Sequence, residues 1–244
     1  SKNRAIRAAC GEYIFTGEDD LEIVPGFFRT LLAHRDRLGV DLVSPRDIWR
    51  HPGESAESAL ARAAMATGRY VDTRRIAIKP ELDTGDDVRV LLAPNPMLGP
   101  ADIFKRIGFD EAYGGNSWRE ETDFQLSVQE AGYSIGLCPH ATAFNCMIEH
   151  DRGGSHAAVG LRRVRWQLVN TWRLLSKHDR FLAERFDIGM PRLFMVRFAV
   201  RRAAMELVVP AMLPRLSRAK RALSRLLAHR TRASKGARRP RMRA

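Results

Sequence analysis

The sequence has few cysteines and no long apolar run, and each shortage excludes a class of protein. Three cysteines, Cys10, Cys138 and Cys146, are an odd number without a CxxC spacing. This pattern indicates neither a disulfide framework nor a zinc site, so we expect a reducing compartment. The longest apolar run near the end, residues 203–213, is interrupted by a glutamate and a proline. We therefore expect no membrane-spanning helix.

Acidic residues are almost absent from the end of the chain. From Pro191 to Ala244 there are 16 of the 41 Lys and Arg residues but only one acid, Glu206, whereas residues 1–190 hold 25 basic and 27 acidic residues. The net charge of +13 therefore belongs to this C-terminal segment. Any argument about anionic partners applies to it alone.

The rest of the chain alternates strand and helix patterns, which predicts an α/β layered domain. Strands are expected at about 13–16, 39–45, 86–94, 133–139 and 141–148, with the second of them ended by Pro45. Helices are expected near the start and at about 25–39, 54–68, 100–108, 121–132 and 157–186.

Three consecutive acids, Glu18, Asp19 and Asp20, directly follow the first strand. Neighbouring carboxylates repel one another, so this arrangement needs a cation to be favourable. Ligands of open α/β sheets gather at the C-terminal ends of strands, and Mg²⁺ or Mn²⁺ prefers carboxylates together with phosphate oxygens. Taken alone, the stretch is equally compatible with a solvated acidic loop.

Later motifs favour the metal. GEYIFTGEDDLEIVPGFF is followed by APNPM, IGFDEAYGGNSW and REETDFQLSVQEAGY. In order and separation these segments resemble the inverting GT-A glycosyltransferases of family 2, over roughly residues 1–180. The resemblance implies a GT-A (Rossmann-like) mixed sheet flanked by helices. It also implies metal-dependent transfer of a sugar from a nucleotide-sugar donor to an acceptor hydroxyl, with inversion.

The resemblance also assigns roles to individual residues. Asp20 is implied to be the principal ligand of Mg²⁺ or Mn²⁺, with Glu18 helping directly or through water. Glu121 is implied to be the general base, although it stands where the family has aspartate, and Glu120 remains the alternative. An acid in the first turn of a helix is kept ionised by the helix dipole, so it can accept the proton of an attacking hydroxyl.

Further residues fall at positions that the family uses for its substrates or its metal. The family's usual metal-binding histidine is replaced by Asn145, so His150 is the expected substitute, ahead of His140 and His156. RRVRW, residues 162–166, faintly resembles the QxxRW motif of processive members. The substrate-binding residues implied are Asp19, Asn95, Asp110, Trp118 and Asp123.

The resemblance is incomplete at the start, because only seventeen residues precede Glu18. In the family the nucleoside-binding strands lie there. The chain therefore resembles the C-terminal portion of such an enzyme, and we expect an exposed sheet edge and little activity from the isolated chain.

The expected domains are a catalytic portion, residues 1–186, and a basic tail, residues 187–244. Two amphipathic helices are expected, at 192–209 and 214–230, before a disordered end. A leucine stripe among basic residues favours an anionic membrane surface, at the inner face of the cell membrane, and a lipid-linked or cell-envelope glycan as acceptor. The alternatives are a non-catalytic protein that binds nucleic acid or membrane through this tail, and a solvated charge run. We expect no specific nucleic-acid partner, because the last basic residues lack interleaved aromatics.

Overall fold

The structure is a computed structural model and describes residues 2–146 and 160–205. The chain divides into two compact units, Ser1–Met195 and Val196–Ala244. The first unit contains the main sheet, the acids at residues 18–20 and the acids at the start of the helix Glu120–Glu130. The expected domain boundary, between residues 186 and 187, remains a prediction.

The main sheet is mixed. Its strands lie in the order β1 (Tyr13–Thr16), β7 (Met97–Pro100), β3 (Leu42–Arg50), β8 (Ile135–Cys146) and β2 (Leu21–Ile23), and β6 (Val88–Arg89) also pairs with β8. Strands β3 and β8 are parallel, whereas the other pairs are antiparallel. Together with the helices on its faces, this sheet confirms the prediction of an α/β fold with a mixed sheet flanked by helices.

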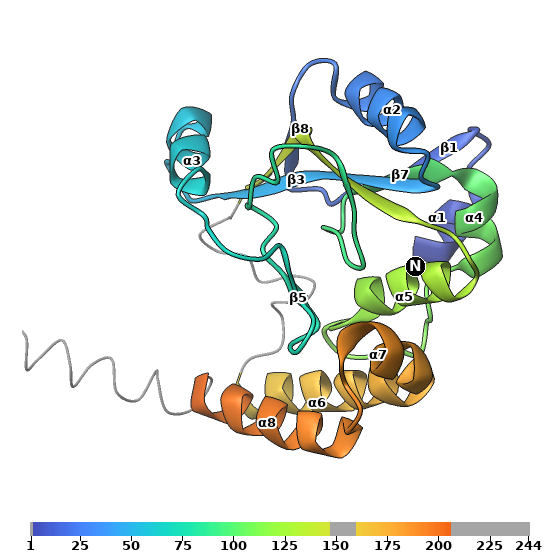
Figure 1. Ribbon diagram of the computed structural model, residues 1–244, viewed down its shortest axis with the longest axis vertical. Coiled ribbons are helices and arrows are strands. Elements are labelled where there is room, and N and C mark those ends of the chain that lie inside the picture. The colour runs from blue at the N-terminus through green and yellow to red at the C-terminus, as the bar shows by residue number, and fades with distance from the viewer. Residues whose placement is uncertain (1, 147–159, 206–244) are drawn as a thin grey trace, which may run out of the picture. The chain divides into compact units, whose positions relative to one another are not determined.

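Helices cover both faces of the sheet (Figure 1). On one face, Phe27 and Leu31 of α2 (Phe27–Leu38) pack against Val43. On the other face lie α1 (Lys2–Ala8), α4 (Ala101–Ile107) and α5 (Glu120–Glu130), whose Phe104 and Phe124 pack against Leu42. Because Leu42 and Val43 are consecutive in a strand, they point to opposite faces, and both are buried.

The remaining elements surround this core. Helix α3 (Ala56–Ala63) begins at Ser55, whose hydroxyl accepts the Ser58 N–H at 3.2 Å. Strands β4 (Val71–Asp72) and β5 (Ala77–Ile78) form a separate two-stranded sheet. Helices α6 (Gly160–Lys177) and α7 (Asp179–Phe186) pack on α5, and α8 (Pro191–Ala203) follows.

Several expected boundaries were wrong. Pro45 does not end its strand, because a register shift between Pro45 and Arg46 accommodates the missing N–H and β3 continues to Arg50. Of the strand expected at 86–94, only β6 forms. Ala93 does not pair with another strand there, because its N–H donates to the Gln125 side chain and its carbonyl accepts from the same side chain. The two strands expected at 133–139 and 141–148 are one, β8, and the long helix expected at 157–186 is divided at His178 into α6 and α7.

The predicted basic tail lies largely outside the described residues. Helix α8 occupies most of the first helix expected there, while the second helix and the end of the chain fall beyond residue 205. Among the described residues, no helix combines the length and apolar character that crossing a membrane requires.

Candidate functional site

The acidic loop after β1 is held by asparagines from two other parts of the sheet. Asn95, just before β7, donates to Glu18 at 2.8 Å, and Asn145, near the end of β8, donates to the other Glu18 oxygen at 3.3 Å. The Cys146 N–H donates to the Asp20 carbonyl at 2.9 Å. The structure thus brings together Glu18, Asp20, Asn95 and Asn145, which are far apart in the sequence.

A fourth carboxylate, which the sequence did not suggest, belongs to this acidic site. Asp47 lies within β3, opposite Ala143 of β8, and is only 6% exposed. Its Oδ1 atom and that of Asp20 are both buried, and neither accepts a hydrogen bond from any residue that the structure describes. Burying a carboxylate oxygen without a hydrogen-bond partner costs free energy, so these two oxygens would be stabilised by a bound cation.

The electrostatics of Asp47 point the same way. Burial, followed by the nearby charges of Glu18, Asp20 and Glu81, raises the pKa of Asp47 to about 7. A divalent cation would remove both the repulsion and the unsatisfied oxygens. The oxygens present are the hard donors that Mg²⁺ and Mn²⁺ prefer, but the three carboxylates Glu18, Asp20 and Asp47 do not all lie within 4.8 Å of one another, so their side chains would have to close around an ion.

The two candidate bases lie at the start of α5 and are paired with a lysine. Lys2 Nζ of α1 lies 2.9 Å from Glu120 Oε2 and 2.5 Å from Glu121 Oε1. Desolvation opposes the charge of Lys2, but the two glutamates outweigh it and raise the lysine pKa. Glu121 is the more exposed of the two, at 30% against 14% for Glu120. Glu121 is therefore more open to an incoming group, and the choice between the two glutamates as the base stays a prediction.

Asp123, expected in the acceptor pocket, is instead buried in a polar network at 1% exposure. Its carboxylate accepts from Tyr113 Oη at 3.0 Å and Lys177 Nζ at 2.7 Å, and it lies 3.0 Å from His178 Nε2. Burial alone would raise the pKa of Asp123, but the bonds from His178 and Lys177 outweigh it and lower the pKa. Asp110 lies at the edge of the same network, 3.6 Å from Lys177.

The glycine-rich loop before α5 is glycine-rich because α6 packs directly on it. Trp166, from the RRVRW segment, lies so close that a Cβ atom on Gly115 would fall 2.2 Å from the indole. Gly115 also has a φ of 69°, which favours glycine. Asn170 donates to the Gly114 carbonyl at 3.0 Å. The RRVRW segment therefore has a packing role in shaping this loop.

The other expected site residues are more scattered. Asp19 is exposed in the acidic loop. Trp118 is partly buried, with the Arg119 guanidinium 5.3 Å from its ring. His140 is exposed and lies beside His34, whereas His150 and His156 lie outside the described residues. Their proposed roles stay predictions.

Sequence reasoning missed Asp47 and Lys2. Asp47 was missed because the strand was expected to end at Pro45, so its burial within β3 could not be read from the sequence. No sequence signal connects Lys2 with Glu120 and Glu121, because 118 and 119 positions separate them.

No protein-family model and no curated protein matches this chain. Among solved structures, it is similar to GalNAc-T7 crystallised with UDP, GalNAc and Mn²⁺, with a TM-score of 0.49 and 11% identity over 72% of this chain. It is also similar to residues 1–349 of S. aureus TarS in complex with UDP-GlcNAc, with a TM-score of 0.44 and 13% identity over 75% of this chain. The chain spans 34% and 50% of the lengths of these two chains. Likenesses this distant assign neither a fold family nor a function.

Proposed function

We propose that this chain takes part in glycosyl transfer from a nucleotide-sugar donor, through the GT-A type of site that its motifs resemble. The observation that supports this most is the acidic site itself. Glu18 of the predicted metal triplet is bound by Asn95 and Asn145, and buried, unsatisfied carboxylate oxygens of Asp20 and Asp47 belong to the same site. In a loop that is only solvated, these oxygens would be exposed to water, because burying them without a partner costs free energy.

In this proposal Asp20, Glu18 and Asp47 hold Mg²⁺ or Mn²⁺. The bound ion would offset the charge of the departing nucleoside diphosphate. Asn95 and Asn145 orient the Glu18 carboxylate, so that its side chain does not have to be ordered when the ion binds. Asp47 adds negative charge from within the sheet, on a strand that cannot move easily.

Glu121 is proposed as the general base that takes the proton of the acceptor hydroxyl, with inversion at the sugar carbon. Glu121 lies in the first turn of α5. Glu121 forms an ion pair with Lys2, and release from Lys2 would free the carboxylate for the acceptor hydroxyl. Glu120 is more enclosed and is proposed to hold Lys2 in place.

The acceptor is proposed to be a cell-envelope or lipid-linked glycan at the inner face of the cell membrane. This part of the proposal depends on the charge of the tail alone, which has 16 basic residues and one acid from Pro191 onward. Such a segment is attracted to anionic lipid.

The proposal is tested by measuring Mn²⁺ binding from the electron paramagnetic resonance signal of the free ion. The full chain is titrated alone and with UDP, GDP or dTDP. We expect Mn²⁺ to bind, and one of the nucleotides to tighten binding beyond its own affinity for the ion. If Mn²⁺ binds equally with and without every nucleotide, the acidic site is a plain cation site in this chain, which would contradict the proposal.

A further inference from the structure

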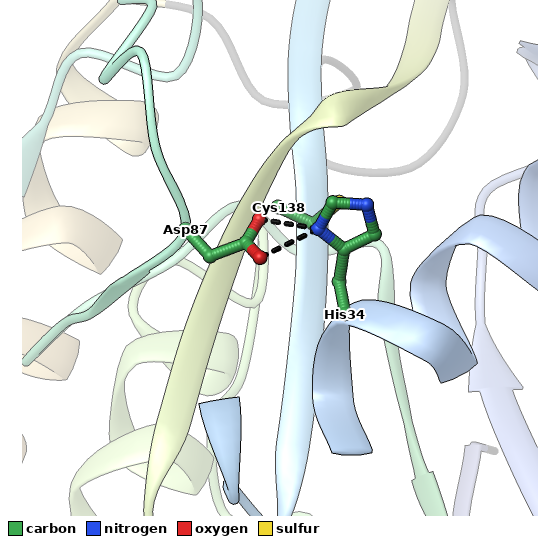
Figure 2. A group of neighbouring side chains, drawn as sticks. All are labelled: His34, Asp87 and Cys138. Atoms are coloured by element: carbon green, nitrogen blue, oxygen red, sulfur yellow. Dashed lines mark hydrogen bonds and ion pairs between the residues drawn. The ribbon is translucent and has the colours of Figure 1, made fainter. Parts of the chain in front are cut away.

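A second cluster of metal-ligating side chains lies apart from the acidic loop in the sequence and uses different chemistry. His34 of α2, Asp87 immediately before β6 and Cys138 of β8 meet at one point (Figure 2). Their ligand atoms all lie within 4.8 Å of one another. His34 Nδ1 faces both Asp87 oxygens, at 2.5 and 2.6 Å.

The cluster is enclosed by the fold. The side chains of His34 and Asp87 are 12% and 6% exposed, and Cys138 is fully buried. The three residues come from a helix, a turn and the longest strand of the sheet, so they are supported by separate elements. Ligands held on a rigid framework lose little conformational freedom when an ion binds.

Two of the contacts within this group compete for one nitrogen. Arg37 Nη2 lies 2.8 Å from the same His34 nitrogen and also contacts Asp87. An imidazole nitrogen carries at most one hydrogen, so His34 Nδ1 cannot both donate to Asp87 and accept from Arg37. The imidazole nitrogen, a carboxylate oxygen and the sulfur lie within 4.8 Å of one another, which is close enough for one cation to replace these competing contacts.

The ligand types select the ion. An imidazole nitrogen, a carboxylate oxygen and a thiolate sulfur together suit Zn²⁺ and do not suit Mg²⁺ or Mn²⁺. Zinc prefers four ligands, and the cluster supplies three. The exposed His140, whose ring centre lies 5.2 Å from that of His34, is the candidate for the fourth. Arg37, whose side chain is 64% exposed, can remain on the outer carboxylate oxygen.

We propose that His34, Asp87 and Cys138 bind a thiophilic divalent cation, Zn²⁺, which joins α2, the turn before β6 and β8. On binding, the thiol proton leaves to solvent and the sulfur bonds to the ion. The contact between His34 and Asp87 opens by about one ångström to admit the ion, through side-chain rotation. The site is independent of the proposed sugar transfer.

The test uses Co²⁺ as a coloured substitute for Zn²⁺, added to the full chain after treatment with a chelator. We expect visible absorption of tetrahedral Co²⁺ and a sulfur-to-cobalt charge-transfer band, both abolished by Zn²⁺. Cys138→Ser removes the charge-transfer band and His34→Gln weakens Co²⁺ binding at least tenfold. Cys10→Ser, which changes an exposed cysteine outside the cluster, leaves both signals unchanged.

A second measurement keeps the test decisive if Cys138→Ser does not fold. In the unmodified chain, buried Cys138 is alkylated only when the fold opens, and Zn²⁺ is expected to slow this reaction at least tenfold while leaving that of exposed Cys10 unchanged, as read by mass spectrometry of peptides. No charge-transfer band and no protection would overturn the proposal and leave an ion pair among His34, Arg37 and Asp87. A band that persists in a folded Cys138→Ser variant would overturn it as well.

Discussion

Asn95 donates a hydrogen bond to Glu18 at 2.8 Å across 77 positions of sequence. This bond joins the loop after β1 to the residue that leads into β7, and it fixes a carboxylate that would otherwise move freely in solvent. Groups that orient a metal ligand typically change metal affinity by 10- to 100-fold when they are removed.

Asn95→Ala is therefore expected to weaken Mn²⁺ binding by roughly tenfold, since Asn145 still holds the other Glu18 oxygen. Removing both donors in Asn95→Ala/Asn145→Ala is expected to weaken it further. Free Mn²⁺ is measured by electron paramagnetic resonance. An unchanged affinity in the double variant would mean that Glu18 is not part of the ion's environment.

Asp47→Asn is expected to stabilise the metal-free chain above neutral pH. Asp47 has a folded pKa of about 7 against an ordinary value of 3.8. The unfolded chain therefore gives up this proton first as the pH rises, and the free energy of unfolding falls between roughly pH 4 and pH 7. In EDTA, the thermal midpoint of the variant should exceed that of the unmodified chain at pH 8 and approach it at pH 4.

The control for this prediction is Asp36→Asn, which removes an equal charge from a side chain that is 70% exposed. It should show no such pH-dependent gain. If the unmodified chain and Asp47→Asn keep the same difference at every pH, Asp47 does not titrate as its surroundings require.

The same substitution should act in the opposite direction on metal binding. Asp47→Asn removes a buried carboxylate charge near Glu18 and Asp20, so we expect Mn²⁺ affinity to fall by at least tenfold. If the variant is more stable without metal and also binds Mn²⁺ less well, then the Asp47 carboxylate destabilises the metal-free fold and contributes to metal binding. Equal Mn²⁺ affinity would remove Asp47 from the site.

The isolated chain is expected to transfer sugar only slowly, and Glu121→Gln is expected to lower this low rate further, by roughly 10²- to 10⁴-fold, the usual contribution of a general base. Binding of nucleotide and Mn²⁺ should be retained, because Glu121 is proposed to act only on the acceptor hydroxyl. Glu120→Gln serves as the matched control and should affect the rate less. The assay measures transfer from the donor that the nucleotide titration selects, and the reverse order of effects would exchange the roles of the two glutamates.

Asp123→Asn is expected to destabilise the fold by roughly 3 kcal/mol, because it removes one partner of a buried network and leaves Lys177 and His178 uncompensated. The pKa of Asp123 is lowered in the folded chain. Its contribution is therefore present above the ordinary aspartate pKa and is lost as the pH falls through the folded value. Denaturant unfolding at pH 7 measures the loss, and a loss no larger than that of Asp36→Asn would contradict this role.

The sequence predicted the local pieces of this molecule better than the contacts between them. The strand at Tyr13–Thr16 was predicted residue for residue, because a short apolar segment between a glycine and acids has few alternatives. The continuation of β3 through Pro45 was missed, since the register shift that permits it depends on the neighbouring strand. The shortening of the strand expected at 86–94 depends on Gln125, which lies 32 positions from Ala93.

The same limit applies to the sites. The acids after β1 were found because they are consecutive, whereas Asp47 joins them only when the sheet forms. The cluster of His34, Asp87 and Cys138 has no spacing pattern, because its members are 53 and 51 positions apart. Sites without a spacing pattern cannot be predicted from the sequence alone, because only the fold brings their residues together.

The most direct measurement is a thermal-shift titration of the full chain with UDP, GDP and dTDP, each with Mn²⁺ or with EDTA. It is made in parallel on Asp20→Ala and on the surface control Asp36→Asn. We expect one nucleotide to raise the thermal midpoint in the presence of Mn²⁺ only, in the unmodified chain and in Asp36→Asn but not in Asp20→Ala. A nucleotide shift that persists in EDTA or in Asp20→Ala, or no shift with any nucleotide, would contradict a nucleotide-sugar site built around Asp20.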